Sequence, residues 1–105
     1  MVDVADMEFS ITRDGSHLVV KVAGRLNAQT APMLQESIGE ALEGILEITF
    51  ELGDLEFISS AGLRILLAAY KLMDKRGGSM QVVNATGDVI SVLEVSGFAS
   101  LFDIK

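Results

Sequence analysis

Cysteine is absent from the chain, and proline and histidine each occur once. Without a thiol, the sequence excludes disulfides, a cysteine nucleophile and a cysteine-based zinc site. Only 22% of the 105 residues are charged and 50% are hydrophobic, which excludes a highly charged or proline-rich disordered chain. We therefore expect one domain, over residues 1–105, that folds on its own.

Basic residues are scarce, and this limits the partners. Eight Lys and Arg stand against fifteen Asp and Glu, so the net charge is −7 and a nucleic-acid partner is not expected. Residues 1–6 are acidic and lack an apolar signal region. The most apolar stretch, residues 63–73, is shorter than the roughly 20 residues that span a bilayer. We expect a cytoplasmic protein with no membrane partner.

Apolar periodicity predicts the order of the elements. Alternation over residues 7–12 and 18–22 predicts two strands, and Asp14-Gly15 between them favours a tight primed turn with positive backbone angles. The patterns that follow predict, in order, a helix with its apolar positions between 34 and 45, a strand over 46–52, a helix over 60–76, a strand over 80–83, a helix over 86–97 and a short strand over 102–104. Strands joined through helices require a parallel arrangement. The expected class is α/β, with a mixed, mostly parallel sheet, an N-terminal antiparallel hairpin and amphipathic helices packed on it.

Several residues suit the predicted helix ends. Thr30 is a candidate cap for the first helix, Pro32 costs no hydrogen bond in a first turn, and Gly44 is a candidate stop. Thr86 and Gly97 are expected to play the same two roles for the third helix. The second helix is expected to end at the pair Gly77-Gly78.

The start of the second helix carries the most information. On a helical wheel Arg64, Lys71 and Lys75 form a narrow polar stripe, and Ser60 lies about 40° from Arg64, whereas Ser59 points away from the stripe. Ser60 is therefore predicted to be exposed. Two interpretations remain open from the residues alone: a serine that caps the helix, or a phosphorylation site beside free amides, the helix dipole and Arg64.

Two segments carry a resemblance to a known family. They are GRLNAQTA at residues 24–31 and DLEFISSAGL at residues 54–63. Together they resemble the landmarks of the STAS domain, specifically of the bacterial anti-sigma factor antagonists. In that family the phosphorylated serine stands two residues before the Gly-Leu pair, which corresponds to Ser60.

The resemblance implies a function, its partners and its surface. The unphosphorylated protein would bind a GHKL-type anti-sigma factor serine kinase and free the sigma factor, phosphorylation at Ser60 would end this, and a PP2C-type phosphatase would reset it. A monomer is implied, with no catalytic, cofactor-binding or metal-binding residue and no cofactor. The implied docking surface comprises Asn27, Thr30, Ser59, Ser60, Ala61, Gly62 and Arg64.

The chain departs from the family pattern at two positions. Ser59 stands where many members have an aspartate before the phosphorylated serine, and Asn27 stands where they have an aspartate after the Gly-x-Leu. Ser59 is thus a second candidate acceptor, although its predicted direction disfavours it.

Other residues suggest other functions. His17 is interpreted as a surface histidine rather than a base, and no glycine-rich phosphate loop occurs in the sequence. Asp54 and Glu56 could serve acid–base chemistry, although solvated loop charges are the simpler interpretation. The leading hypothesis is thus the antagonist, the alternatives being a STAS adaptor subunit that regulates a transporter ATPase in lipid traffic and a small hydrolase using Asp54 or Glu56.

Overall fold

A computed structural model describes residues 2–4 and 6–105, with side chains from residue 6 onward. Residues 1 and 5, which belong to the acidic segment considered above, lie outside the described residues. The elements, in chain order, are β1 (Val2–Val4), β2 (Met7–Asp14), β3 (His17–Leu26), α1 (Ala31–Glu40), β4 (Glu47–Glu51), β5 (Leu55–Ile58), α2 (Ser60–Lys75), β6 (Ser79–Val83), α3 (Gly87–Val95), the 3-10 helix η1 (Phe98–Ser100) and β7 (Asp103–Ile104).

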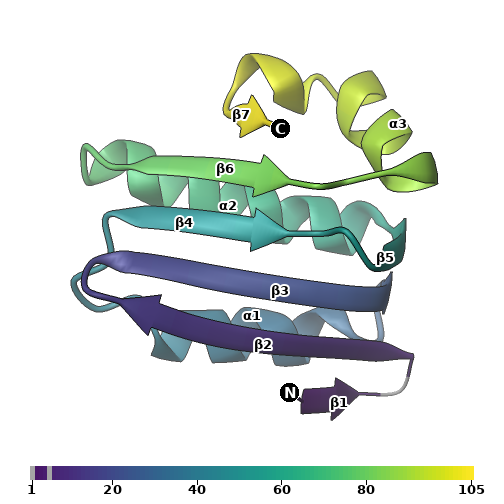
Figure 1. Ribbon diagram of the computed structural model, residues 1–105, viewed down its shortest axis with the longest axis horizontal. Helices are drawn as coiled ribbons and strands as arrows, with labels where there is room; N and C mark the ends of the chain where they lie inside the picture. The colour runs from purple at the N-terminus through teal and green to yellow at the C-terminus, as the bar shows by residue number, and fades with distance from the viewer. Residues whose placement is uncertain (1, 5) are drawn as a thin grey trace.

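The strands form one mixed sheet in the order β1-β2-β3-β4-β6-β7, with β5 paired to β3 beside the end of β4 (Figure 1). The pairs β1–β2 and β2–β3 are antiparallel, and the pairs among β3, β4, β5, β6 and β7 are parallel. The expected α/β class, the N-terminal hairpin and the mostly parallel sheet are therefore confirmed.

The hairpin turn differs in one detail from the expectation. Asp14 pairs with His17, so the two central residues are Gly15 and Ser16 rather than Asp14 and Gly15. Gly15 has a φ of +62°, and Ser16 keeps a negative φ. A positive angle at the first central residue alone is the pattern of a type II′ turn, for which glycine is favoured at that position.

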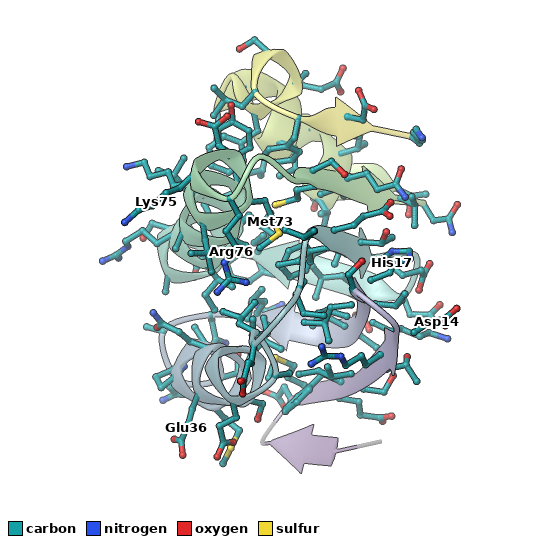
Figure 2. All side chains as sticks on the ribbon, turned by 90° about the vertical axis from the view of Figure 1, so that its left-hand side faces the viewer. Asp14, His17, Glu36, Met73, Lys75 and Arg76 are labelled. Atoms are coloured by element: carbon teal, nitrogen blue, oxygen red, sulfur yellow. The ribbon has the colours of Figure 1, made fainter. Side chains whose placement is uncertain are left out.

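Helices α1 and α2 cover one face of the sheet, and Figure 2 shows these two layers side by side. The buried faces of both layers are apolar, because alternate residues of each strand meet the inner stripes of the helices. Residues that are at most 1% exposed come from every part of this core: Met7, Leu18, Val20, Leu26, Leu34, Ile48, Phe50, Leu66 and Met73. The opposite face of the sheet carries His17 and other partly exposed side chains.

Helix α1 is shorter than predicted. It begins with Pro32 in its first turn, as expected, but it ends at Glu40, before the expected stop at Gly44. The reason is tertiary: Arg76 Nη1 donates to the carbonyl oxygens of Leu42 and Ile45, at 2.7 and 2.8 Å, which holds these residues in a turn. Gly44, with a φ of +76°, lies in this turn and not at the helix end, so that expectation was wrong.

The other helix ends follow the sequence more closely. Gly77 and Gly97 have φ angles of +73° and +78° and follow the last residues of α2 and α3, which confirms both predicted stops. Thr86 occupies the residue before α3, but its side chain caps no amide in the described part of the chain. The predicted capping role of Thr86 is therefore wrong.

Two strands were not predicted. β5 consists of four residues with Glu56 exposed among them, so its alternation is too short to stand out from a loop. β1 is a three-residue edge strand. Within residues 2–4 and 6–105, the helices are all too short or too polar to cross a bilayer.

Candidate functional site

The two segments singled out in the sequence meet at one edge of the sheet. β3 and β5 run parallel and end side by side, with Leu26 paired to Ile58. The Ser59 amide donates to the Leu26 carbonyl oxygen at 2.9 Å. The loop that follows β3 and the loop that leads into α2 are therefore neighbours. In open α/β sheets, functional loops gather at the carboxyl ends of parallel strands.

Asn27 organises the loop after β3. Its side-chain oxygen Oδ1 accepts hydrogen bonds from the amides of Gln29 and Thr30, at 2.9 and 3.1 Å. The predicted role of Thr30 as the capping side chain is wrong, because within the described residues its hydroxyl caps no helix amide. Instead, Thr30 Oγ1 accepts from the Asn27 amide and donates to the Arg25 carbonyl oxygen, each at 2.9 Å. The buried Thr30 thus closes the loop on itself.

Ser60 is the first residue of α2 and is exposed, as the wheel predicts. Arg64, one turn further on, is also exposed, and its Nε donates to the Ser60 carbonyl oxygen at 3.4 Å. The guanidinium group of Arg64 therefore lies next to the backbone of Ser60, the residue that carries the candidate hydroxyl. The first-turn amides of a helix have no intrahelical acceptor, so the helix start adds positive potential at the same place.

Ser59 occupies the position before α2 with extended backbone, at φ −99° and ψ 179°. Its Oγ atom is buried and has no hydrogen-bond partner among the described residues. The side chain points inward, in agreement with the expectation that it is directed away from the polar stripe. A buried hydroxyl is not accessible to a kinase, and this geometry disfavours Ser59 as the acceptor.

Gly62 lets α2 approach the sheet. It is buried, and a Cβ atom placed on it would lie 2.7 Å from Ile58 Cγ1 and 2.8 Å from Leu26 Cγ. Those two side chains end the paired strands β3 and β5. The absence of a side chain at Gly62 therefore fixes how closely Ser60 and its half-buried neighbour Ala61 lie to the loop of Asn27.

Arg25 is a residue at this edge that the sequence reasoning did not select. Its guanidinium carbon lies 4.3 Å from the centre of the Phe57 ring, and Arg25 is the partner of Phe57 in the β3–β5 register. The signal was present, since Arg25 lies inside the segment 24–31 and Phe57 inside 54–63. The strand β5 that pairs them was itself not predicted.

The remaining candidates lie elsewhere. His17 Nε2 hydrogen-bonds with Thr49 Oγ1 at 2.7 Å on the sheet face opposite the helices, and it lies 3.9 Å from Glu47 Oε2. Asp54 and Glu56 are exposed, and within residues 6–105 no group of three acidic or histidine side chains is arranged to hold a metal ion. These contacts explain His17 as a structural residue.

The fold and the site define a small α/β protein whose candidate functional surface is made of two adjoining loops at the carboxyl ends of parallel strands. The sequence model of the STAS domain family matches residues 8–105. The chain therefore belongs to the STAS domain family.

Relatives of known description place the chain among the anti-sigma factor antagonists. The anti-sigma F factor antagonist of Paenibacillus polymyxa is 32% identical over 89 residues, which cover 83% of this chain and 76% of that protein. The crystal structure of an anti-sigma factor antagonist from Mycobacterium paratuberculosis has a TM-score of 0.83 and 27% identity, over 98% of this chain and 89% of the other.

A third comparison supports the fold alone. The Bacillus cell fate determinant SpoIIAA, in its phosphorylated form, has a TM-score of 0.76 at 17% identity and covers 93% of this chain and 91% of its own. The names of the two closer-matched relatives describe regulators of sigma activity rather than enzymes.

Proposed function

We propose that residues 1–105 act as one cytoplasmic STAS domain whose unphosphorylated form binds a kinase-type anti-sigma factor and releases the sigma factor. Phosphorylation of Ser60 by that GHKL-type kinase ends the interaction, and a PP2C-type phosphatase restores it. The domain itself performs no catalysis. The observation that carries this proposal is an exposed Ser60 at the start of α2, in a chain of the antagonist family.

The chemistry around Ser60 suits a switch. A phosphate adds about −1.5 to −2 charges, and the helix start and Arg64 supply the compensating positive potential. Ser60 is exposed, so the added group needs no rearrangement of the core. SpoIIAA, which shares the fold, exists in a phosphorylated form, and this supports the view that the fold accommodates phosphate.

The proposed docking surface surrounds Ser60. It comprises Asn27, Thr30, Ser59, Ala61, Gly62 and Arg64 together with Ser60 itself. The buried members Thr30 and Gly62 act by shaping the two loops, whereas Ser60 and Arg64 are exposed and would touch the partner. A phosphate on Ser60 would repel a partner that presents acidic groups to Arg64.

The Paenibacillus polymyxa and Mycobacterium paratuberculosis relatives are both described as anti-sigma factor antagonists, so the transporter adaptor is not the favoured alternative. The two functions differ in one respect that can be measured, because an adaptor does not require phosphate on Ser60. The hydrolase alternative requires turnover that is lost in Asp54→Ala or Glu56→Ala.

The test combines mass spectrometry with affinity capture. The chain is recovered from its native bacterium and its phosphorylated residue is mapped, and Ser60→Ala and Ser60→Asp baits are then compared with the unmodified chain. We expect phosphate on Ser60 alone, and capture of a GHKL-type kinase by Ser60→Ala but not by Ser60→Asp.

Ser59→Ala is the matched control, since it removes the neighbouring hydroxyl and leaves the candidate acceptor in place. It should still be phosphorylated and should still lose its kinase partner when phosphorylated. Phosphate that disappears in Ser59→Ala would reject Ser60 as the acceptor. An unmodified Ser60 with equal capture of a transporter ATPase by every bait would reject the antagonist function.

A further inference from the structure

The outer face of the helix layer carries two stripes of opposite charge. Glu36 and Glu40 are exposed on α1. The exposed residues of α2 include the basic stripe Arg64, Lys71 and Lys75, and one acidic residue, Asp74, lies beside Lys75. Figure 2 shows Glu36 and Lys75 on the side of their helices that faces away from the sheet. Acidic and basic side chains thus lie on adjacent ridges of one surface.

Among the side chains of residues 6–105, these charges have no ion-pair partner. Over residues 6–105, the side-chain ion pair closer than 4.0 Å is that of His17 with Glu47, on the other face of the sheet. Arg64 donates to a backbone oxygen of its own helix. The stripes on α1 and α2 are therefore available to an external partner.

An apolar groove separates the two stripes. It has a volume of about 210 Å³, and it is lined by Ile38, Gly39 and Leu42 on α1 and the turn after it and by Ile65, Ala68 and Leu72 on α2. Gly39 and Ala68 are exposed and small, so another helix pair can approach closely. An exposed apolar groove with a polar rim is typical of a protein interface.

We propose that this groove pairs with the same groove of a second copy of the chain. α1 and α2 both follow strands of the parallel part of the sheet, so they run in the same direction (Figure 1). With a twofold axis that runs along the groove, α1 of each copy lies on α2 of the other copy. The two pairs of helices then pack face to face between the two sheets. Each acidic ridge meets a basic ridge, whereas an axis across the groove would oppose like charges.

The groove residues also give the register. Gln35 and Leu42 on the α1 side have the same seven-residue spacing as Ile65 and Leu72 on the α2 side. With these pairs opposite each other, Glu40 lies one residue, about 1.5 Å along the helix, from the level of Lys71. A twofold rotation about an axis along the groove leaves every residue at the same height along that axis. Glu40 of one copy therefore faces Lys71 of the other, and symmetry makes this contact twice.

The overall charge of −7 does not prevent the pairing. At about 0.15 M ionic strength the Debye length is about 8 Å, so charges on the far sides of the two copies are screened, while opposed side chains in contact are not. Arg64 belongs both to the basic stripe and to the docking surface proposed around Ser60, so the second copy and the anti-sigma factor would compete for this part of α2. The proposed dimer replaces the monomer that the family resemblance implies.

Sedimentation equilibrium at about 0.15 M salt tests this pairing. We expect the unmodified chain to reach twice the monomer mass as its concentration rises. Glu40→Lys alone would oppose two lysines and Lys71→Glu alone would oppose two glutamates, so each variant should remain monomeric. Both side chains are exposed, so circular dichroism and thermal unfolding should show that the two variants fold normally.

Mixing the two variants gives the decisive result. In a mixed pair, every contact between positions 40 and 71 joins opposite charges, so an equimolar mixture of Glu40→Lys and Lys71→Glu should form a dimer that neither forms alone. Glu94→Lys, on the exposed face of α3, makes the same change in net charge as Glu40→Lys and should dimerise like the unmodified chain. A monomer at all concentrations up to about 1 mM, or no dimer in the mixture, would overturn the proposal.

Discussion

At the scale of single residues, the two neighbours of the Ser60 site show that contacts outweigh helix propensity. Gly62 lies inside a helix, where glycine is unfavourable by about 1 kcal/mol relative to alanine. Ser59 occupies a position where serine commonly caps a helix, yet its hydroxyl meets no acceptor or donor within the described residues. Substitution at each position should therefore have the opposite effect from that expected of the residue type.

Gly62→Ala should destabilise the protein by about 1–3 kcal/mol, because the added methyl group overlaps Ile58 and Leu26 in the core. Urea unfolding followed by circular dichroism measures this. Gly39→Ala is the matched control, since a Cβ there has no described atom within 4 Å, and at low protein concentration it should raise the free energy of unfolding by up to about 1 kcal/mol. Equal stabilisation by both substitutions would contradict the packing argument.

Ser59→Ala should leave the free energy of unfolding unchanged or raise it slightly. A capping serine costs about 1 kcal/mol when replaced by alanine, but the Ser59 hydroxyl makes no capping bond in the described structure, and its burial without a partner is unfavourable. Thermal and urea unfolding of the variant would show whether the Ser59 hydroxyl stabilises the start of α2 or not. A loss of about 1 kcal/mol would show that Ser59 does cap α2 in solution.

At the scale of elements, the start of α1 depends on the loop before it. The Asn27 side chain accepts two backbone amides, and the buried Thr30 hydroxyl ties the same loop to the end of β3. The capping function is thus fulfilled three residues before the position that the sequence pattern indicates. The loop of Asn27 lies beside the start of α2, where Ser60 is, because β3 and β5 end side by side.

Asn27→Ala should destabilise the protein by about 1 kcal/mol, because two amides lose their acceptor. Asn27→Asp keeps an oxygen at the same place and adds a negative charge near the positive end of α1, so it should be at least as stable as the unmodified chain. Parallel urea titrations of the two variants measure the difference. Similar losses in both would mean that the amide nitrogen of Asn27, and not its oxygen, matters.

Much of this architecture follows from local patterns. The hairpin, α2 with its glycine stop and the exposure of Ser60 were predictable, because alternation, helical periodicity and left-handed glycines are properties of short segments. The end of α1 was not, since the contacts of Arg76 with Leu42 and Ile45 join residues more than thirty positions apart. The pairing of Arg25 with Phe57 was not predictable for the same reason, because the two residues are far apart in the sequence.

At the scale of the whole molecule, the fold separates the site from the core. The sheet and the helices α1 and α2 enclose the apolar residues, while the loops of Asn27 and Ser60 lie at the carboxyl ends of the strands. The hairpin turn at Ser16 precedes β3, so it lies at the opposite end of that strand. A charge added at Ser60 therefore changes the proposed docking surface and leaves the packing intact.

Ser60→Asp should accordingly change binding and not stability. We expect its free energy of unfolding to stay within about 0.5 kcal/mol of the unmodified chain, since surface substitutions commonly do so and a negative charge suits the start of α2. Binding to the anti-sigma factor captured from the native bacterium should weaken at least about tenfold, through repulsion of the partner's acidic groups. Ser16→Asp, which adds the same charge at the opposite end of β3, should bind normally. If Ser60→Asp lost binding and unfolded together, the charge would be acting through the fold, and the role of Ser60 as a surface switch would have to be abandoned.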